Sequence, residues 1–274
     1  MVSYRYKPPP PLDRFVEVIW VMESAAAPHP KERLLPDGSV ELVFSLREET
    51  FPVYSRENLD RCEIFRGSVI CGPHSQPFAI DTTTEVSVAG VHFKPGGAYP
   101  FLKLPSGELH NVHVGLDAFW GRSGASRVRE QLLVARTPEA KARVLEETLL
   151  SAVGGAPDRH PAVAFALNAF HGMPETQKIA AVADRIGLSA RRFIDVFRKE
   201  VGLTPKLFCR VRRFQKVLRL VSSGRAVNWP EVALTCGYFD QAHFIHDFRA
   251  FSGINPSGYV AGYTGHANHV PMRG

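Results

Sequence analysis

The last hundred residues of the chain contain one sequence pattern twice, and this repeat constrains the fold more than any other feature. In each copy a short apolar segment ends at a glycine, and a polar residue then opens a segment with two phenylalanines four positions apart. The polar openers, Ser189 and Asp240, are separated by 51 residues. Side chains at i and i+4 share one helix face, so each copy predicts two short helices joined by a tight glycine turn.

The two copies share their small residue, their glycine turn and their closing Gly-x-x-Pro element. These positions are Ala183, Gly187, Ser189, Phe193, Phe197 and 202–205 in the first copy, and Ala233, Gly237, Asp240, Phe244, Phe248 and 253–256 in the second. A helix from about Pro205 to Val221 is expected between them, because Thr204 is a good N-cap and proline suits a first turn. At 1.5 Å per residue it would be roughly 25 Å long. Each copy is a helix-turn-helix arrangement, whose second helix, here called the reading helix, could enter a major groove of DNA. The connecting helix would hold the two reading helices roughly 34 Å apart, near one turn of DNA.

The first part of the chain has a different pattern. From about residue 15 to 93, short runs of β-branched and aromatic residues alternate with Pro, Gly and Asp turns. This alternation is typical of an antiparallel β-sandwich or barrel, here cupin-like. Two helical segments, 126–135 and 138–153, follow it, and the second is a candidate dimer contact or a helix packed on its own sheet.

We therefore expect an α+β chain in three parts. Residues 1–157 would form a β-rich domain for sensing or dimerisation, residues 158–262 an all-α domain of two helix-turn-helix units joined by a long helix, and residues 263–274 a disordered tail. The Gly-Gly-Ala-Pro run at 154–157 marks the boundary, because these residues cannot continue a helix.

Charge separates the same two domains. Residues 1–157 contain 17 basic and 19 acidic side chains, whereas residues 158–274 contain 16 basic and 8 acidic ones. A basic excess confined to the helical part favours a polyanionic partner for that part. The chain has no apolar run of membrane-spanning length, and its four cysteines are widely spaced. We expect no membrane partner, no disulfide and a cytoplasmic location.

Together these residues resemble the DNA-binding domain of the AraC/XylS family of transcription regulators. The resemblance covers about residues 161–260 and is clearest in Gly202-Leu203-Thr204-Pro205 and in the run from Ala233 to Phe244. It implies two tandem helix-turn-helix units bound to double-stranded DNA, with no catalytic residue, metal or other cofactor. The N-terminal part is similar to the β-rich sensor domains attached to that module, through Pro36-Asp37-Gly38 and Phe93-Lys94-Pro95-Gly96-Gly97.

The resemblance also implies which side chains face DNA. The base-facing positions fall on Arg191, Arg192, Ile194 and Asp195 in the first unit, and on Gln241, Ala242, Ile245 and His246 in the second. Arginine can bind guanine and glutamine can bind adenine in the major groove. Family members often have arginine at the positions of Asp195 and His246, so an operator sequence does not carry over. Phosphate contacts are expected from Arg198, Lys199, Lys206, Arg225 and Arg249.

The sequence thus predicts a regulator of transcription whose N-terminal domain senses a small-molecule effector or forms a homodimer, with RNA polymerase as a further partner. A constitutive regulator, whose N-terminal domain only dimerises or binds a protein, is the alternative. Trp20, Phe44, His92 and Phe93 could line an effector pocket, although aromatic side chains inside a sandwich are more often core.

Enzymatic functions are less well supported. A cupin-like metal oxygenase would need a His-x-His pair, and the sequence has none. There is also no Gly-x-Ser-x-Gly elbow and no phosphate-binding loop. Three His-x-x-His pairs exist, at 110/113, 243/246 and 266/269, but we predict no metal at them. A repair protein that transfers alkyl groups to cysteine needs activated cysteines at zinc-ligand spacing, which Cys62 and Cys71 do not offer.

Overall fold

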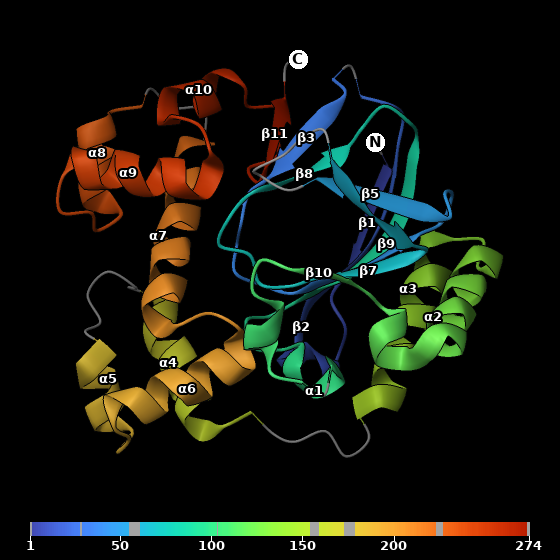
Figure 1. The fold of residues 1–274 in the computed structure, drawn as a ribbon, viewed down its shortest axis with the longest axis horizontal. Helices are drawn as coiled ribbons and strands as arrows, with labels where there is room; N and C mark the ends of the chain where they lie inside the picture. The colour runs from blue at the N-terminus through green and yellow to red at the C-terminus, as the bar shows by residue number, and fades with distance from the viewer. Residues whose placement is uncertain are drawn as a thin grey trace.

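The computed structural model describes residues 2–27, 29–54, 61–102, 104–153, 159–172, 179–222 and 227–272. Its N-terminal part consists of two antiparallel sheets, as the alternating pattern predicts (Figure 1). The first sheet contains, in order, β1 (Val2–Tyr6), β2 (Val16–Ser24), β9 (Val86–Phe93), β4 (Glu41–Ser45), β7 (Ser68–Cys71) and β10 (His113–Gly115). The second contains β11 (His269–Met272), β3 (Lys31–Leu34), β8 (Phe78–Asp81), β5 (Thr50–Tyr54) and β6 (Cys62–Arg66).

One face of the first sheet is covered by helices α2 (Asp117–Val134) and α3 (Pro138–Val153). The two short helices η1 (Leu12–Arg14) and η2 (Ser106–Leu109) and the single turn α1 (Tyr99–Leu102) complete this domain. Leu145 and Leu149 are 1% exposed, so α3 packs on the sheet, the second of the two roles expected for it. Phe44 and Phe93 belong to the same core, which makes them packing residues and not pocket residues.

Helix α2 is longer than the segment 126–135 that the sequence predicts. It begins at Asp117 and includes a kink at Gly121, where φ is +70°. Glycine is poorly suited to a helix interior, and the stretch from Gly121 to Gly124 contains two of them. Packing of the helix against the sheet therefore outweighs local propensity here.

The C-terminal part is helical, and its elements follow the predicted order. They are α4 (Pro161–Gly172), α5 (Ile179–Arg185), α6 (Ala190–Val201), α7 (Pro205–Val221), α8 (Trp229–Thr235), α9 (Gln241–Ser252) and α10 (Pro256–Ala261). Their core contains Phe193, Phe197, Phe244 and Phe248, each 0% exposed. This confirms the helical face predicted from the paired phenylalanines.

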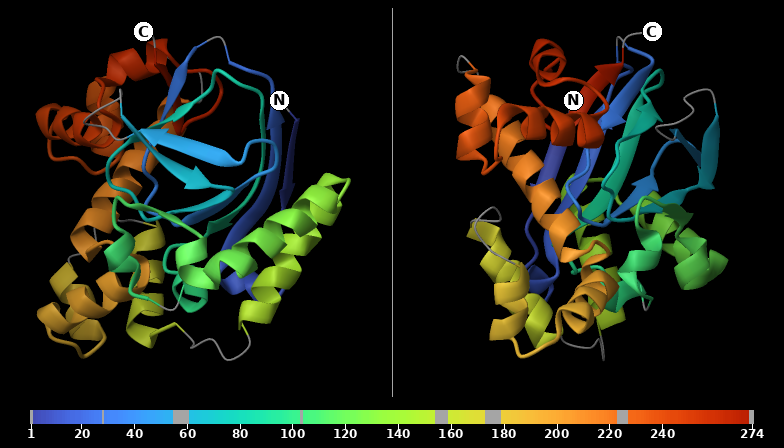
Figure 2. Two further views of the ribbon diagram at one scale, coloured as in Figure 1. Left: turned by 45° about the vertical axis from the view of Figure 1, so that its right-hand side comes forward. Right: turned by 60° about the vertical axis from the view of Figure 1, so that its left-hand side comes forward.

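The helical domain lies along one side of the sheets, while α2 and α3 lie on the other (Figure 2). Helix α7 runs between a unit formed by α5 and α6 and a unit formed by α8 and α9 (Figure 1). Within the described part of the chain, none of the helices combines the length and hydropathy that a membrane span requires.

The tail predicted to be disordered is instead partly ordered. Residues His269–Met272 form β11, which pairs antiparallel with β3 at the edge of the second sheet. The Tyr259 hydroxyl donates to the carbonyl of Ala267 at 2.7 Å, and the Leu35 amide donates to that of Asn268 at 2.8 Å. The end of the chain therefore returns to the N-terminal domain, a correction to the expected tail at 263–274.

Candidate nucleic-acid interface

The first helix-turn-helix unit is built from α5 and α6. Gly187 makes the turn with φ +66°, and the Ser189 hydroxyl oxygen caps α6 by accepting from the Arg192 amide at 3.3 Å. Gly202 ends the helix in the left-handed conformation, with φ +90°. These are the start and stop signals that the sequence predicts.

The second unit repeats this construction with α8 and α9. Gly237 makes the turn with φ +74°, and the Asp240 carboxylate accepts from the His243 amide at 2.7 Å. Gly253 ends α9 with φ +73°. Because Phe244 and Phe248 fix one face of α9 in the core, the opposite face of the helix is turned outward.

The predicted base-facing side chains lie on those outward faces. The exposed ones are Arg191, Arg192, Ile194, Asp195, Gln241, Ala242 and His246. Ile245 differs, because it is half-buried and packs against the helical core. Its apolar side chain contributes to holding α9 in place.

Of the five predicted phosphate contacts, four are exposed: Arg198, Lys199, Lys206 and Arg249. The fifth, Arg225, lies outside the described residues. Arg198 and Lys199 are at the end of α6 that meets the N-terminal domain. A Cβ built on Gly107 would lie 3.0 Å from Arg198 Cγ, and Lys199 Nζ is 5.8 Å from the centroid of the Tyr99 ring.

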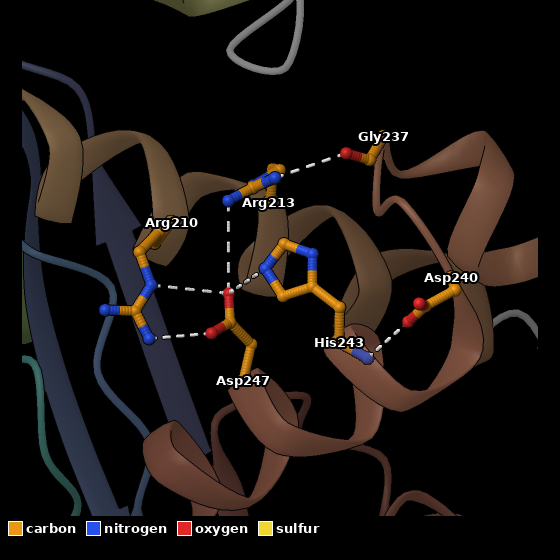
Figure 3. A network of polar contacts seen from close by, with 6 residues as sticks. All are labelled: Arg210, Arg213, Gly237, Asp240, His243 and Asp247. Atoms are coloured by element: carbon orange, nitrogen blue, oxygen red, sulfur yellow. Dashed lines mark hydrogen bonds and ion pairs between the residues drawn. The ribbon is translucent and has the colours of Figure 1, made fainter.

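A buried carboxylate on α9 anchors the second reading helix to α7 (Figure 3). Asp247 receives two hydrogen bonds from Arg210, at 2.6 Å to Oδ1 and 3.4 Å to Oδ2. Arg213 and His243 approach Asp247 Oδ2 at 4.0 and 3.9 Å, and Arg213 also donates to the Gly237 carbonyl at 3.2 Å. This network links the turn of the second unit, its reading helix and the connecting helix.

The sequence patterns point to neither Asp247 nor Arg210 as part of the site. From the sequence alone, Asp247 resembles an ordinary surface acid of α9, because nothing local indicates that α7 places an arginine beside it. Tyr238 closes the same site: the Arg213 guanidinium lies 5.0 Å from the centre of its ring. Burial, reinforced by Asp247, raises the pKa of the Tyr238 hydroxyl, so this side chain stays neutral.

The Pro36-Asp37-Gly38 turn of the N-terminal domain lies against α7. Gln215 Nε2 donates to the Pro36 carbonyl at 2.9 Å, and a Cβ on Gly38 would lie 3.1 Å from Leu203 Cδ1. The neighbouring Leu35 belongs to the helical core. The turn that suggested a sensor domain is thus a contact between the two domains.

The Phe93–Gly97 segment has the same role at the end of α6. Arg159 donates to the Pro95 carbonyl at 3.0 Å, and a Cβ on Gly96 would lie 3.4 Å from Val201 Cγ2. Both stretches that supported the resemblance of the N-terminal part therefore face the helical domain.

The glycines that end the two reading helices also contact the N-terminal domain. A Cβ on Gly202 would overlap Pro73 and lie 2.9 Å from the Ser106 carbonyl oxygen. A Cβ on Gly253 would lie 3.5 Å from the guanidinium carbon of Arg33. Each reading helix thus has an outward N-terminal part and a C-terminal end held by the other domain.

His92 belongs to a charged group beside this domain contact. Its Nε2 is 3.3 Å from Asp37 Oδ2, and its Nδ1 is 3.6 Å from Glu41 Oε1, which also accepts from Trp20 Nε1 at 2.9 Å. Burial alone would lower the pKa of His92, but Asp37, Glu41 and Glu17 together raise it to about 9. Two of the predicted pocket residues, Trp20 and His92, are therefore engaged in polar contacts.

Two of the His-x-x-His pairs, 110/113 and 266/269, contain a histidine whose ring nitrogen contacts a protein side chain. His110 Nε2 and the Ser75 hydroxyl are 2.8 Å apart, and burial lowers the pKa of His113 to about 4. His269 Nδ1 is 2.9 Å from Glu32 Oε2, across the pairing of β11 with β3. Among the described residues, no group of three His, Cys, Asp or Glu side chains is arranged to hold a metal ion.

Two capped helix-turn-helix units on one connecting helix, each presenting an outward reading helix, define a DNA-binding protein of the tandem helix-turn-helix class. Residues 182–262 match the model of a family described as a helix-turn-helix domain, and residues 4–115 match one described as a domain of unknown function (DUF6597). The C-terminal domain is a helix-turn-helix domain of the AraC type.

Several solved structures are similar to all or part of the chain. ToxT from Vibrio cholerae strain SCE256, determined with an unsaturated fatty acid bound, is 10% identical and has a TM-score of 0.51; the match covers 90% of this chain and 96% of ToxT. The DNA-binding domain of AdpA in complex with a target DNA is 26% identical over 38% of this chain and 92% of its own, with a TM-score of 0.35. The C-terminal domain of AraT, a response regulator from Geobacillus stearothermophilus, is 20% identical over 39% of this chain and 90% of its own, with a TM-score of 0.37. None of the curated protein sequences matches the chain.

Proposed function

We propose that this protein regulates transcription in response to a small molecule, by binding two successive major grooves of one DNA duplex with α6 and α9. The first unit would contact bases through Arg191, Arg192, Ile194 and Asp195. The second would do so through Gln241, Ala242, Ile245 and His246. The observation that carries this proposal is the matched pair of reading helices, each capped at its start, packed through two phenylalanines and exposed on the opposite face.

The distribution of charge also supports DNA binding. The candidate phosphate ligands are Arg198, Lys199, Lys206, Arg225 and Arg249. All of them that the structure describes are exposed side chains of the helical domain. The N-termini of α6 and α9 add backbone amides that suit phosphate. A duplex bound through about 6 phosphates should bind roughly 10³-fold more weakly at 200 mM salt than at 50 mM.

Regulation by an effector is supported by the contacts between the domains. The N-terminal domain touches the ends of both reading helices at Gly202 and Gly253. A ligand that rearranged Pro73 or Arg33 would therefore act directly on the DNA-binding units. ToxT, whose fold the chain shares, has been seen with a fatty acid bound. A homodimer and a contact with RNA polymerase complete the proposed set of partners.

The experiment is a selection of bound duplexes from random DNA by the purified full chain, followed by affinity measurements on the selected site. Arg191→Ala and Gln241→Ala should each weaken binding by about 1 to 3 kcal/mol and relax base preference at one position. Arg122→Ala, an exposed arginine on α2, is the matched control and should bind as the wild type does.

Two results would contradict the proposal. One is a salt response that is flat between 50 and 200 mM. The other is an equal loss on every sequence for Arg191→Ala and Gln241→Ala, which would show that these residues do not read bases. A melting temperature that does not change with any small molecule would favour the constitutive regulator instead.

A further inference from the structure

The second helix-turn-helix unit exposes a large aromatic ring at the start of its reading helix. Phe239 is 89% exposed, more than any other large hydrophobic side chain among the described residues. The phenylalanines that follow it, Phe244 and Phe248, are 0% exposed. Burying this ring against a partner would recover the free energy that its exposure to water costs.

The backbone on both sides holds Phe239 in an outward position. On one side Tyr238 is 3% exposed and packs edge-on against Phe244, with ring centroids 5.5 Å apart. On the other side the Asp240 carboxylate caps α9 through the His243 amide. With Tyr238 directed into the core and Asp240 fixed as the cap, the ring between them is presented to solvent at the N-terminus of α9.

The first unit has no counterpart to this ring. Between the turn glycine and the cap it has one residue, Leu188, whereas the second unit has two, Tyr238 and Phe239. Leu188 is partly buried against the helical core, and Tyr238 has the corresponding place. Phe239 is therefore an additional residue that the packing of the unit does not use.

The neighbouring side chains indicate what the ring meets. Gln241 and Ala242, the first two residues of α9, are exposed and lie where the N-terminal part of a recognition helix enters the major groove. The apolar groups in that groove are the C5-methyl groups of thymine, which phenylalanine and alanine side chains contact favourably. A charged, hydrated phosphate group, in contrast, provides no apolar surface against which a phenyl ring could be buried.

We propose that Phe239 is a specificity-determining residue that packs on thymine methyl groups at the half-site read by α9. The proposal rests on the proposed function, because it requires α9 to lie in a major groove. It makes the two half-sites unequal: the one read by α9 would prefer thymine at the edge next to the N-terminus of the helix. The half-site read by α6 would lack that preference.

The test is a double-mutant cycle that measures DNA binding when the Phe239 side chain and a thymine methyl group are removed separately and together. A duplex selected by the full chain is synthesised with each thymine of one half-site replaced in turn by uracil, which removes only the C5-methyl. For the wild type, one or two replacements should weaken binding roughly three- to fourfold. Phe239→Ala should weaken binding to the original duplex about five- to tenfold and should be insensitive to the same replacements.

The controls separate this contact from folding and from general apolar effects. Phe239→Leu keeps an apolar side chain and should retain part of the sensitivity to uracil. Ile64→Ala removes another exposed hydrophobic side chain, 65% exposed on β6, and should leave binding unchanged. Because Phe239 is in water in the free protein, Phe239→Ala should melt at the wild-type temperature.

Each remaining outcome overturns the proposal. Wild-type affinity for Phe239→Ala would assign the ring to something other than DNA, including a protein partner. A loss that is the same with thymine and uracil at every position would assign it to the sugar-phosphate backbone. In both cases Gln241→Ala would still weaken binding, so the proposed function would stand. If the full chain selects no duplex, the proposed function fails first and this inference with it.

Discussion

From the burial of the Asp247–Arg210 pair we predict that replacing Arg210 destabilises the protein more than replacing Asp247. The side chain of Asp247 is 2% exposed, whereas that of Arg210 is 31% exposed. Arg210→Met leaves a carboxylate in the interior, with Arg213 and His243 no closer than 4.0 and 3.9 Å. A buried charge without its partner costs about 3 to 5 kcal/mol. Asp247→Asn leaves a neutral acceptor and a guanidinium that reaches water, at a cost of about 1 to 2 kcal/mol.

Hydrogen exchange of the α9 amides is the appropriate measurement, because it reports opening of this unit separately from the rest of the chain. Arg210→Met should accelerate exchange from α9 more than Asp247→Asn does. Arg219→Met, which replaces an exposed arginine of the same helix, should change it little. The reasoning from burial is refuted if Asp247→Asn opens α9 as readily as Arg210→Met.

Three further predictions follow from the contacts between the domains. With a folded pKa of about 9 against 6.5, His92 contributes about 3 kcal/mol of stability that is fully present below pH 6.5 and is lost as the pH rises through 9. His92→Gln should therefore flatten the wild-type fall in urea midpoint across that interval, and unchanged pH curves would contradict the assignment. Gly202→Ala, which introduces a Cβ against Pro73 at φ +90°, should lower the free energy of unfolding by about 1 to 3 kcal/mol more than Gly187→Ala, where nothing lies within 4 Å; equal losses would argue against the packing. A chain ended after Asn268 lacks β11 and should be about 2 kcal/mol less stable by urea unfolding, whereas full stability would show that the strand contributes nothing.

Much of the helical domain could be predicted from the sequence because its signals are local. Ser189, Thr204 and Asp240 are caps that accept from amides three residues away. Gly202 and Gly253 end their helices through their own backbone conformation. Such interactions are written in neighbouring residues, so the helix bounds and the outward faces could be inferred without knowledge of the tertiary fold.

What could not be predicted depends on partners distant in the sequence. β11 pairs with residues more than two hundred positions earlier, while its proline and the glycines that precede it, Gly262 and Gly265, are typical of an unstructured tail. Asp247 becomes an anchor because α7 places Arg210 beside it. The Pro36-Asp37-Gly38 turn suggested a family but not its contact with Gln215. In each case tertiary packing decides the role of a residue that local patterns leave open.

The pairing of the C-terminal strand β11 with β3 has a consequence for the two glycines, Gly202 and Gly253, that end the reading helices. Gly202 contacts Pro73, and Gly253 contacts Arg33, which belongs to β3, the strand that pairs with β11. The C-terminal ends of both reading helices thus contact the same N-terminal domain. A change in the shape of that domain would lengthen or shorten the distance between α6 and α9, and with it the number of base pairs between the two half-sites that the protein fits.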